Sequence, residues 1–207
     1  MIELNIIYSD GVSKIEVYDD YREIYLYGKS IKEIRGLEQF NNLEILHISY
    51  NYIVELDLSP LINLKTLICN NNIIQELNFS GLVNLELLYF DNNFCGSKLN
   101  LVSLINLKYL SLCRNNICRT ELDLYANIKL EYIQINNNNC EAKLNLNQLK
   151  DLKELHCNNN NISELNLSDL TNLQVLCCSD NNISKLTLKS NLNLKILSCS
   201  SNNIFEN

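Results

Sequence analysis

The side chains best suited to chemistry in this sequence are two histidines and nine cysteines. Glu154 and His156 stand two residues apart, and Cys177 takes the position of His156 in the next copy of a repeated segment. A thiol beside a histidine can be activated as a nucleophile. The sequence offers no phosphate-binding loop, nucleophile elbow or set of oxyanion donors to accompany this group. We therefore predict an ordinary surface cluster and no enzymatic activity.

Metal binding is not indicated either. His47 and His156 stand at the same position of segments five repeats apart, which separates them by roughly 24 Å at the spacing of neighbouring strands. The cysteines show no C-x-x-C spacing of the kind that binds zinc. We expect reduced thiols that pack as small hydrophobic residues at inward positions, namely Cys69, Cys95, Cys140, Cys157, Cys178 and Cys199. The sequence thus predicts no catalytic residue, no metal and no cofactor.

The segment that positions these residues is repeated along nearly the whole chain. Copies of L-x-x-L-x-L-x-x-N-x-I, spaced by 21 to 23 residues, begin at Leu43, Leu64, Leu85, Leu107, Leu130, Leu152, Leu173 and Leu194, and a degenerate copy begins at Tyr21. Apolar residues at the first, fourth and sixth positions alternate through a short strand, and neighbouring copies can pair as a parallel sheet. Because one copy cannot bury its own apolar face, stacking must close the core.

Asparagine occupies the ninth position of every clear copy. An amide offers both a donor and an acceptor where the strand turns inward, so it can satisfy main-chain groups that have left the sheet. Within the runs 136–139 and 158–161 we expect only Asn138 and Asn160 to be buried, with replaceable turn or surface residues around them. The predicted structural ladder comprises Asn51, Asn72, Asn93, Asn115, Asn138, Asn160, Asn181 and Asn202.

The repeated pattern resembles the leucine-rich-repeat superfamily, and its short period is nearest to the internalin-like, phosphatase-regulator-like and bacterial 21-residue classes. The resemblance implies an α/β horseshoe-type solenoid that is mainly β with little helix, with a parallel sheet on the concave face. Segments such as Glu55–Leu58 alternate and are too short for a long helix, so we expect short extended or 3-10 segments on the convex face. Extra residues near Gly96, Arg119 and Glu141 should fall on that face.

Residues 1–20 lie outside the repeat. Two alternating runs around Ser9-Asp10-Gly11 predict a β-hairpin that caps the first repeat. We expect residues 21–207 to form the solenoid, with about nine repeats. The sequence shows no equivalent cap after Asn202, so the last repeat offers an edge that could pair with a second copy.

Composition and charge limit the partners. The chain has a formal charge of −7 without a cluster of Lys or Arg, so we expect no nucleic acid and no membrane as partner. No apolar run approaches the length of a membrane helix, and the first residues do not resemble a secretory signal. We therefore expect a cytoplasmic protein. If the source is a pathogen or a virus, we expect it in the cytoplasm of the host cell.

Charged residues alternate in sign down the stack at two positions. The second position reads Arg22, Glu44, Lys65, Glu86, Lys108, Glu131, Lys153, Gln174 and Lys195. The residue before the convex leucine reads Glu76, Lys98, Glu121, Lys143, Glu164 and Lys185. We predict two charge ladders that favour solubility and oppose a slip of one repeat, which would bring like charges together.

Apolar and aromatic residues occupy outward positions of the predicted sheet. The third and fifth positions should face solvent, and an apolar stripe there is typical of a protein-recognition surface. Alternatively, these side chains simply cover one another across strands. We predict a non-enzymatic interaction module that binds a protein or peptide through Tyr25, Ile45, His47, Ile68, Leu87, Tyr89, Tyr109, Tyr132 and His156. The alternative is a structural protein that self-associates through its C-terminal edge.

Overall fold

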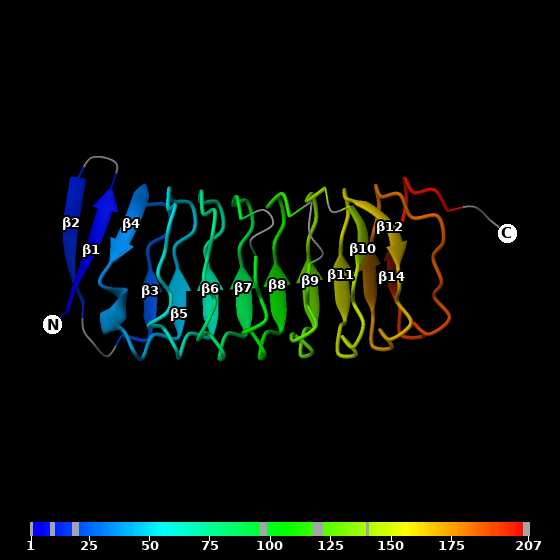
Figure 1. The fold of residues 1–207 in the computed structure, drawn as a ribbon, viewed down its shortest axis with the longest axis horizontal. Helices are drawn as coiled ribbons and strands as arrows, with labels where there is room; N and C mark the ends of the chain where they lie inside the picture. Colours follow the sequence, from blue (N-terminus) through cyan, green and yellow to red (C-terminus); the bar gives the residue numbers. More distant parts are fainter. Residues whose placement is uncertain are drawn as a thin grey trace.

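The chain folds as an elongated solenoid whose turns follow one another along its long axis (Figure 1). The computed structural model describes residues 2–8, 11–17, 21–95, 99–117, 122–139 and 141–204. The described N-terminal and C-terminal segments lie at opposite ends of the stack (Figure 1). This arrangement is the one that a tandem repeat of short strands requires, because each turn contacts only its neighbours.

One long parallel sheet runs through the whole stack. Its strands pair in the order β14-β13-β11-β9-β8-β7-β6-β5-β3, and each contributes the third to fifth positions of one repeat. The register joins equivalent positions of neighbouring copies, as in Leu46 with Leu67. The strands are β3 (Glu23–Tyr25), β5 (Ile45–His47), β6 (Thr66–Ile68), β7 (Leu87–Tyr89), β8 (Tyr109–Ser111), β9 (Tyr132–Gln134), β11 (Glu154–His156), β13 (Val175–Cys177) and β14 (Ile196–Ser198). The predicted horseshoe-type solenoid, with this sheet on its concave face, is confirmed.

The core is a continuous column of the inward residues. Leu43, Leu46 and Ile48 show how the first, fourth and sixth positions are fully buried between two turns. The convex leucines close the column from the other side, as Leu56 and Leu58 do in the same turn. Each turn thus buries its apolar face only because another turn packs on it.

The convex side contains short extended pieces and little helix, as predicted. Its regular elements are the 3-10 helix η1 (Leu37–Gln39) and the strands β4 (Ile31–Arg35), β10 (Glu141–Leu144) and β12 (Asn161–Leu165). β10 and β12 pair in parallel. Across the described ranges no helix is long and apolar enough to cross a membrane.

A hairpin stands at the N-terminal end of the stack. β1 (Ile2–Tyr8) and β2 (Gly11–Val17) pair antiparallel, and β1 also pairs with β4 of the first repeat. Ile6 is fully buried and so joins the hairpin to the core. The predicted turn residues Ser9 and Asp10 lie outside the described residues. The division into a cap at residues 1–20 and a solenoid at 21–207 stays a prediction.

The ninth-position asparagines bridge neighbouring turns. Asn138 is fully buried, and its Nδ2 donates to the main-chain oxygens of Leu112 at 2.8 Å and Ile135 at 2.9 Å. Its Oδ1 accepts the main-chain N–H of Asn115 at 2.8 Å. The amide therefore satisfies groups of two consecutive turns at once. Its energetic weight stays a prediction.

A second row of amides corrects one expectation. We expected the neighbours of Asn138 and Asn160 to be replaceable, but Asn136 and Asn158 are half-buried at the seventh position. The Oδ1 of Asn136 accepts the N–H of Asn158 at 2.8 Å, and the Oδ1 of Asn158 accepts the N–H of Ser179 at 2.8 Å. The chain leaves the sheet at this position, so a main-chain N–H of the next turn no longer has a main-chain acceptor. The amide oxygen of the asparagine accepts that N–H instead.

Several predicted features fall outside the described residues. Among them are the insertions near Gly96 and Arg119, the ladder residues Lys98 and Glu121, and Cys140. The third expected insertion, at Glu141, lies at the start of β10 on the convex side.

Candidate functional site

Glu154, His156 and Cys177, the group that the sequence singled out as a possible nucleophile with its neighbours, lie together on the adjacent strands β11 and β13. The Nε2 of His156 lies 3.3 Å from the Oε2 of Glu154, and His156 is paired in register with Cys177 on β13. Burial, and then the negative charge of Glu154, raise the pKa of the Cys177 thiol. A nucleophilic cysteine requires the opposite shift. The pKa shift of Cys177 is therefore opposite to the shift that activates a thiol as a nucleophile.

The described cysteines are free thiols. Cys69, Cys157 and Cys178 are fully buried, in agreement with their predicted inward positions. Cys199 also packs against the core, as its predicted inward position requires, but it is only half-buried, because no described turn packs over it. Burial raises the pKa of Cys178 to about 12 and that of Cys95 to about 12. The described residues include no group of three or more His, Cys, Asp or Glu that could hold a metal ion.

These positions predict the order of thiol labelling. In the native protein at neutral pH, iodoacetamide should modify Cys113, Cys177 and Cys199 before the buried thiols, because these three are partly exposed. Cys69 and Cys157 should react only when the chain opens, because both are fully buried. Mass mapping of timed reactions measures this order. Early labelling of Cys157, or a native disulfide between inward cysteines, would contradict the assignment.

Three tyrosines form the centre of the concave face, and we name them the central tyrosine cluster: Tyr89, Tyr109 and Tyr132. The rings of Tyr89 and Tyr109 are stacked with centroids 4.5 Å apart, and those of Tyr109 and Tyr132 lie 6.0 Å apart. The Nζ of Lys153 lies 6.0 Å from the centroid of Tyr132. Burial, followed by the neighbouring Tyr89, raises the pKa of Tyr109. The cluster presents one connected aromatic surface.

The other predicted concave residues are less exposed than we expected. Tyr25 is 57% exposed, whereas Ile45, Ile68 and Leu87 are half-buried, as are the two histidines and the central tyrosine cluster. Side chains on adjacent strands therefore cover one another in part, as the alternative reading of the stripe held. The same residues contribute to packing and to the surface.

A second aromatic group lies around His47, and the sequence pattern predicted only Tyr25 and His47 of it. His47 lies edge-on to Tyr25 at 6.1 Å and to Tyr27 at 5.5 Å, and Tyr27 lies 5.1 Å from Tyr50. Burial lowers the pKa of His47, which favours the neutral form of its ring. Tyr27 and Tyr50 stand at the seventh and eighth positions, which we had assigned to turns. An available signal was that both positions are aromatic only in these first two copies.

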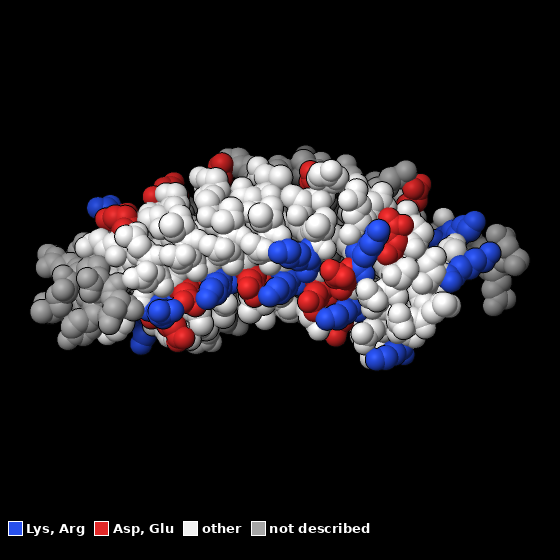
Figure 2. Space-filling model, turned by 90° about the horizontal axis from the view of Figure 1, so that it is seen from below, with Lys and Arg blue, Asp and Glu red and all other residues white. Residues whose placement is uncertain are grey.

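The charge ladder of the second position borders the concave sheet. Figure 2 shows this row of alternating basic and acidic side chains along the molecule. Glu44 pairs with Arg22 at 2.6 Å and with Lys65 at 2.7 Å, and the hydrogen bond from Lys65 lowers the pKa of Glu44. Lys108 pairs with Glu86 at 2.7 Å, and Lys153 pairs with Glu131. This edge carries five basic and three acidic residues, and each of its glutamates is paired with a basic side chain.

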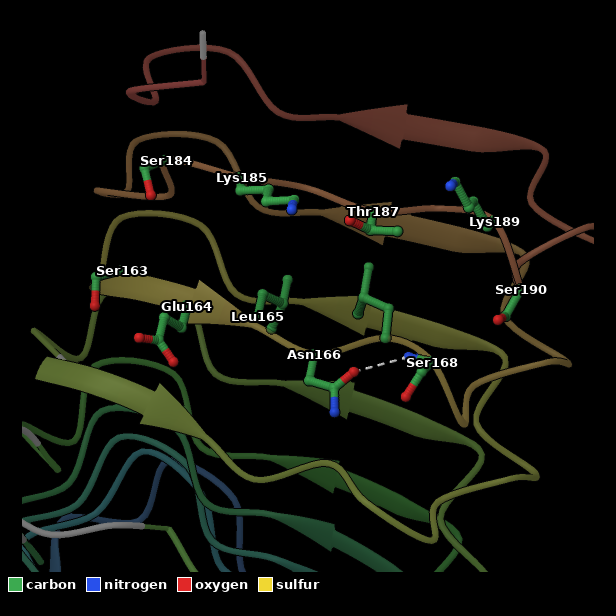
Figure 3. A pocket seen from close by; sticks show the side chains of 11 residues that line it. Ser163, Glu164, Leu165, Asn166, Ser168, Ser184, Lys185, Thr187, Lys189 and Ser190 are labelled. Atoms are coloured by element: carbon green, nitrogen blue, oxygen red, sulfur yellow. Dashed lines mark hydrogen bonds between the residues drawn. The ribbon is translucent and has the colours of Figure 1, made fainter. Parts of the chain in front are cut away.

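A small pocket of about 330 Å³ lies on the convex side, between residues 163–168 and 184–190 (Figure 3). Exposed hydroxyl groups, Glu164 and two lysines line it. The Oδ1 of Asn166 accepts the N–H of Ser168 at 3.1 Å, as the Oδ1 of Asp57 accepts the N–H of Ser59 at 2.9 Å in an earlier turn. The lining contains no histidine or cysteine. We find no arrangement for acid–base or nucleophilic chemistry among these lining residues.

Comparisons with known proteins agree on the fold. No protein-family model matches the chain, and no curated protein matches it significantly. The functional domain of InlJ from Listeria monocytogenes, which includes a cysteine ladder, is 33% identical over 95% of this chain with a TM-score of 0.87. Internalin C2 from Listeria monocytogenes is 26% identical over 85% of this chain, with a TM-score of 0.72.

A further solved relative is TLR13 in its complex with ssRNA13. It is 26% identical over 87% of this chain, with a TM-score of 0.68. This chain spans 43% of the InlJ chain, 80% of the internalin C2 chain and 27% of the TLR13 chain.

Proposed function

We propose that this chain, a leucine-rich-repeat protein of the internalin-like type, is a non-enzymatic interaction module that binds a protein or peptide on its concave face. The observation that carries the proposal is the central tyrosine cluster, with its stacked rings at 4.5 Å on the open side of the sheet. Tyrosine is enriched at the centre of protein interfaces, because it offers a large rigid contact area and a polar end. A cytoplasmic location remains part of the proposal.

The surroundings of the cluster suit an interface. Two half-buried apolar side chains, Ile68 and Leu87, extend the aromatic surface toward β6. The charged row of the second position borders it on one side, which gives the apolar centre and polar rim that protein interfaces have. The second aromatic group around His47 lies on the same sheet and lengthens the surface toward β3.

Charge favours a protein over a nucleic acid. The complex of TLR13 with ssRNA13 gives a precedent for nucleic acid on a related fold. In this chain, however, three of the four lysines in the row beside the sheet are paired with glutamates, as Lys108 is with Glu86. The formal charge of −7 further opposes a phosphate backbone. We therefore propose a protein or peptide partner.

Site-specific photo-crosslinking tests the proposed face. A photoreactive phenylalanine analogue replaces Gln134, which is half-buried on β9 beside the cluster. The control carries the same analogue at Val102, which is 53% exposed outside the sheet. We expect a protein to be cross-linked in lysate from Gln134 and not from Val102. Equal yields from both positions, or a yield only from Val102, would overturn the concave-face proposal.

Self-association through the last repeat is the second candidate. Leu197 is 44% exposed, whereas its equivalent Leu176 on the previous strand is fully buried. A second copy could cover this apolar edge by adding a strand to β14. Sedimentation should then show a concentration-dependent dimer that is weakened by Ile196→Lys. A monomer at all concentrations would reject this candidate.

A further inference from the structure

A groove opens on the convex side where the cap meets the first repeats. It has a volume of about 960 Å³ and lies between β4 and the convex segments of the next two repeats. Its lining comprises Ile7, Lys32, Glu33, Ile34, Arg35, Gly36, Leu37, Glu38, Val54, Glu55, Leu56, Asp57, Pro60, Glu76 and Asn78. The groove is separate from the concave face, since the concave sheet contributes none of these residues.

One wall of the groove is a strand with an open edge. β4 pairs with β1 on one side. On the other side, the single main-chain hydrogen bond between described residues 31–35 and 52–57 joins the N–H of Tyr52 to the oxygen of Ile31 at 2.7 Å. In a later pair of turns the equivalent segments β10 and β12 form a parallel ladder that includes Leu144 with Leu165. The edge of β4 therefore has main-chain groups available to another strand.

The rim of the groove carries acidic residues at a position where later repeats alternate between acidic and basic residues. The residue before the convex leucine is Glu33, Glu55 and Glu76 in three consecutive repeats, whereas the same position alternates in sign from Glu76 onward. Like charges that recur at one position of neighbouring turns repel each other. Glu38 and Asp57 add to this charge, and of the two basic lining residues Arg35 is already paired with Glu33. The rim therefore favours a cationic partner.

The floor of the groove is apolar. Ile34, Leu37 and Leu56 form buried parts of it, and Val54 is 38% exposed. A strand that lies in the groove would turn alternate side chains toward this floor and toward the acidic rim, because side chains of a strand alternate with a period of two.

We propose that this groove binds an extended segment of a partner protein in which basic and apolar residues alternate. The segment adds as a strand to the open edge of β4, its apolar side chains cover Val54 and the floor, and its lysines or arginines neutralise Glu55 and Glu38. Main-chain hydrogen bonds supply affinity without sequence preference, and the alternating side chains supply selectivity. The site is independent of the concave face.

The experiment uses the full chain and a fluorescein-labelled octapeptide of alternating Lys and Val, and it measures fluorescence anisotropy at low salt. The variant Glu38→Gln with Glu55→Gln should weaken binding about tenfold, because both carboxylates lie on the exposed rim. The matched control Glu164→Gln changes the same repeat position as Glu55 at a distant turn and should leave binding unchanged. Melting temperatures verify that each variant is folded.

Two further probes separate the elements of the proposal. An octapeptide of alternating Glu and Val should not bind, and N-methylation of alternate residues of the basic peptide should abolish binding by removing main-chain donors. Variants of the central tyrosine cluster should bind the basic peptide normally, which distinguishes this site from the concave face. The proposal is overturned if the basic peptide does not bind, if the acidic peptide binds equally well, or if the double Gln variant retains full affinity.

Discussion

Replacing Asn138 by Ala is expected to lower the free energy of unfolding by about 1 to 3 kcal/mol. The side chain is fully buried, donates to the main-chain oxygens of Leu112 and Ile135, and accepts the N–H of Asn115. Alanine would leave these groups without partners in a site that water cannot reach. Urea unfolding followed by circular dichroism measures the loss as a lower midpoint at an unchanged slope.

The matched control is the adjacent Asn137. It is exposed and has a φ of 60°, and the eighth position has a positive φ in every clear copy, as in Asn71 at 56° and Asn159 at 53°. Glycine adopts this conformation readily, so Asn137→Gly should change stability little. Asn137→Ala is a poorer control, because alanine in the left-handed region costs about 1 kcal/mol. Equal losses for Asn138→Ala and Asn137→Gly would reject the special role of the ninth position.

The seventh position gives an intermediate test in the same run. Asn136 is half-buried, and its Oδ1 accepts the N–H of Asn158. We expect Asn136→Ala to cost less than Asn138→Ala, because water can reach the N–H that it leaves unpaired. The three variants together assign a separate role to each asparagine in a run that is uniform in sequence.

The fold could be predicted because the same pattern of inward apolar residues and a ninth-position asparagine recurs in every clear copy. The fourth-position leucines, such as Leu67 and Leu88, recur at a fixed spacing, and this alone fixes the strand, its inward face and its parallel register. The role of Asn136 was not predicted, because asparagine, aspartate, serine and cysteine all occur at the seventh position. A hydrogen bond from one turn to the next does not show in a pattern within a single copy.

The candidate site could be predicted only in part. Alternation placed Tyr89, Tyr109 and Tyr132 on the outward face of neighbouring strands. Their partial burial depends on ring orientation, which sequence spacing does not determine. The groove beside β4 was not predicted, because it involves β4 and its pairing with the cap strand β1, which the repeat pattern does not describe.

The double variant Tyr89→Ala with Tyr109→Ala is expected to abolish capture of the partner proposed for the concave face. Tyrosines at the centre of an interface often contribute about 2 kcal/mol or more each to binding. These two rings are stacked at 4.5 Å, so their removal takes away the middle of the surface. Affinity purification followed by quantitative mass spectrometry compares the variant with the wild-type chain.

Stability must be separated from binding in this comparison, because both tyrosines are half-buried. Loss of the stacked pair should cost about 0.5 to 1.5 kcal/mol beyond the buried area, so the melting temperature of the double variant should fall. Two controls separate the effects. Tyr89→Phe with Tyr109→Phe retains the rings, and Tyr125→Ala removes a tyrosine that is 68% exposed outside the sheet.

The expected pattern is that the Ala pair is folded and captures nothing, while Tyr125→Ala and the Phe pair still capture the partner. If the Ala pair unfolds, the tyrosines act mainly in packing across β7 and β8, and the alternative in which outward side chains simply cover one another is the better account. If the Ala pair folds and captures the same proteins as the wild-type chain, the partner binds elsewhere. The acidic groove beside β4 is then the next surface to test, because its variants leave the concave face unchanged.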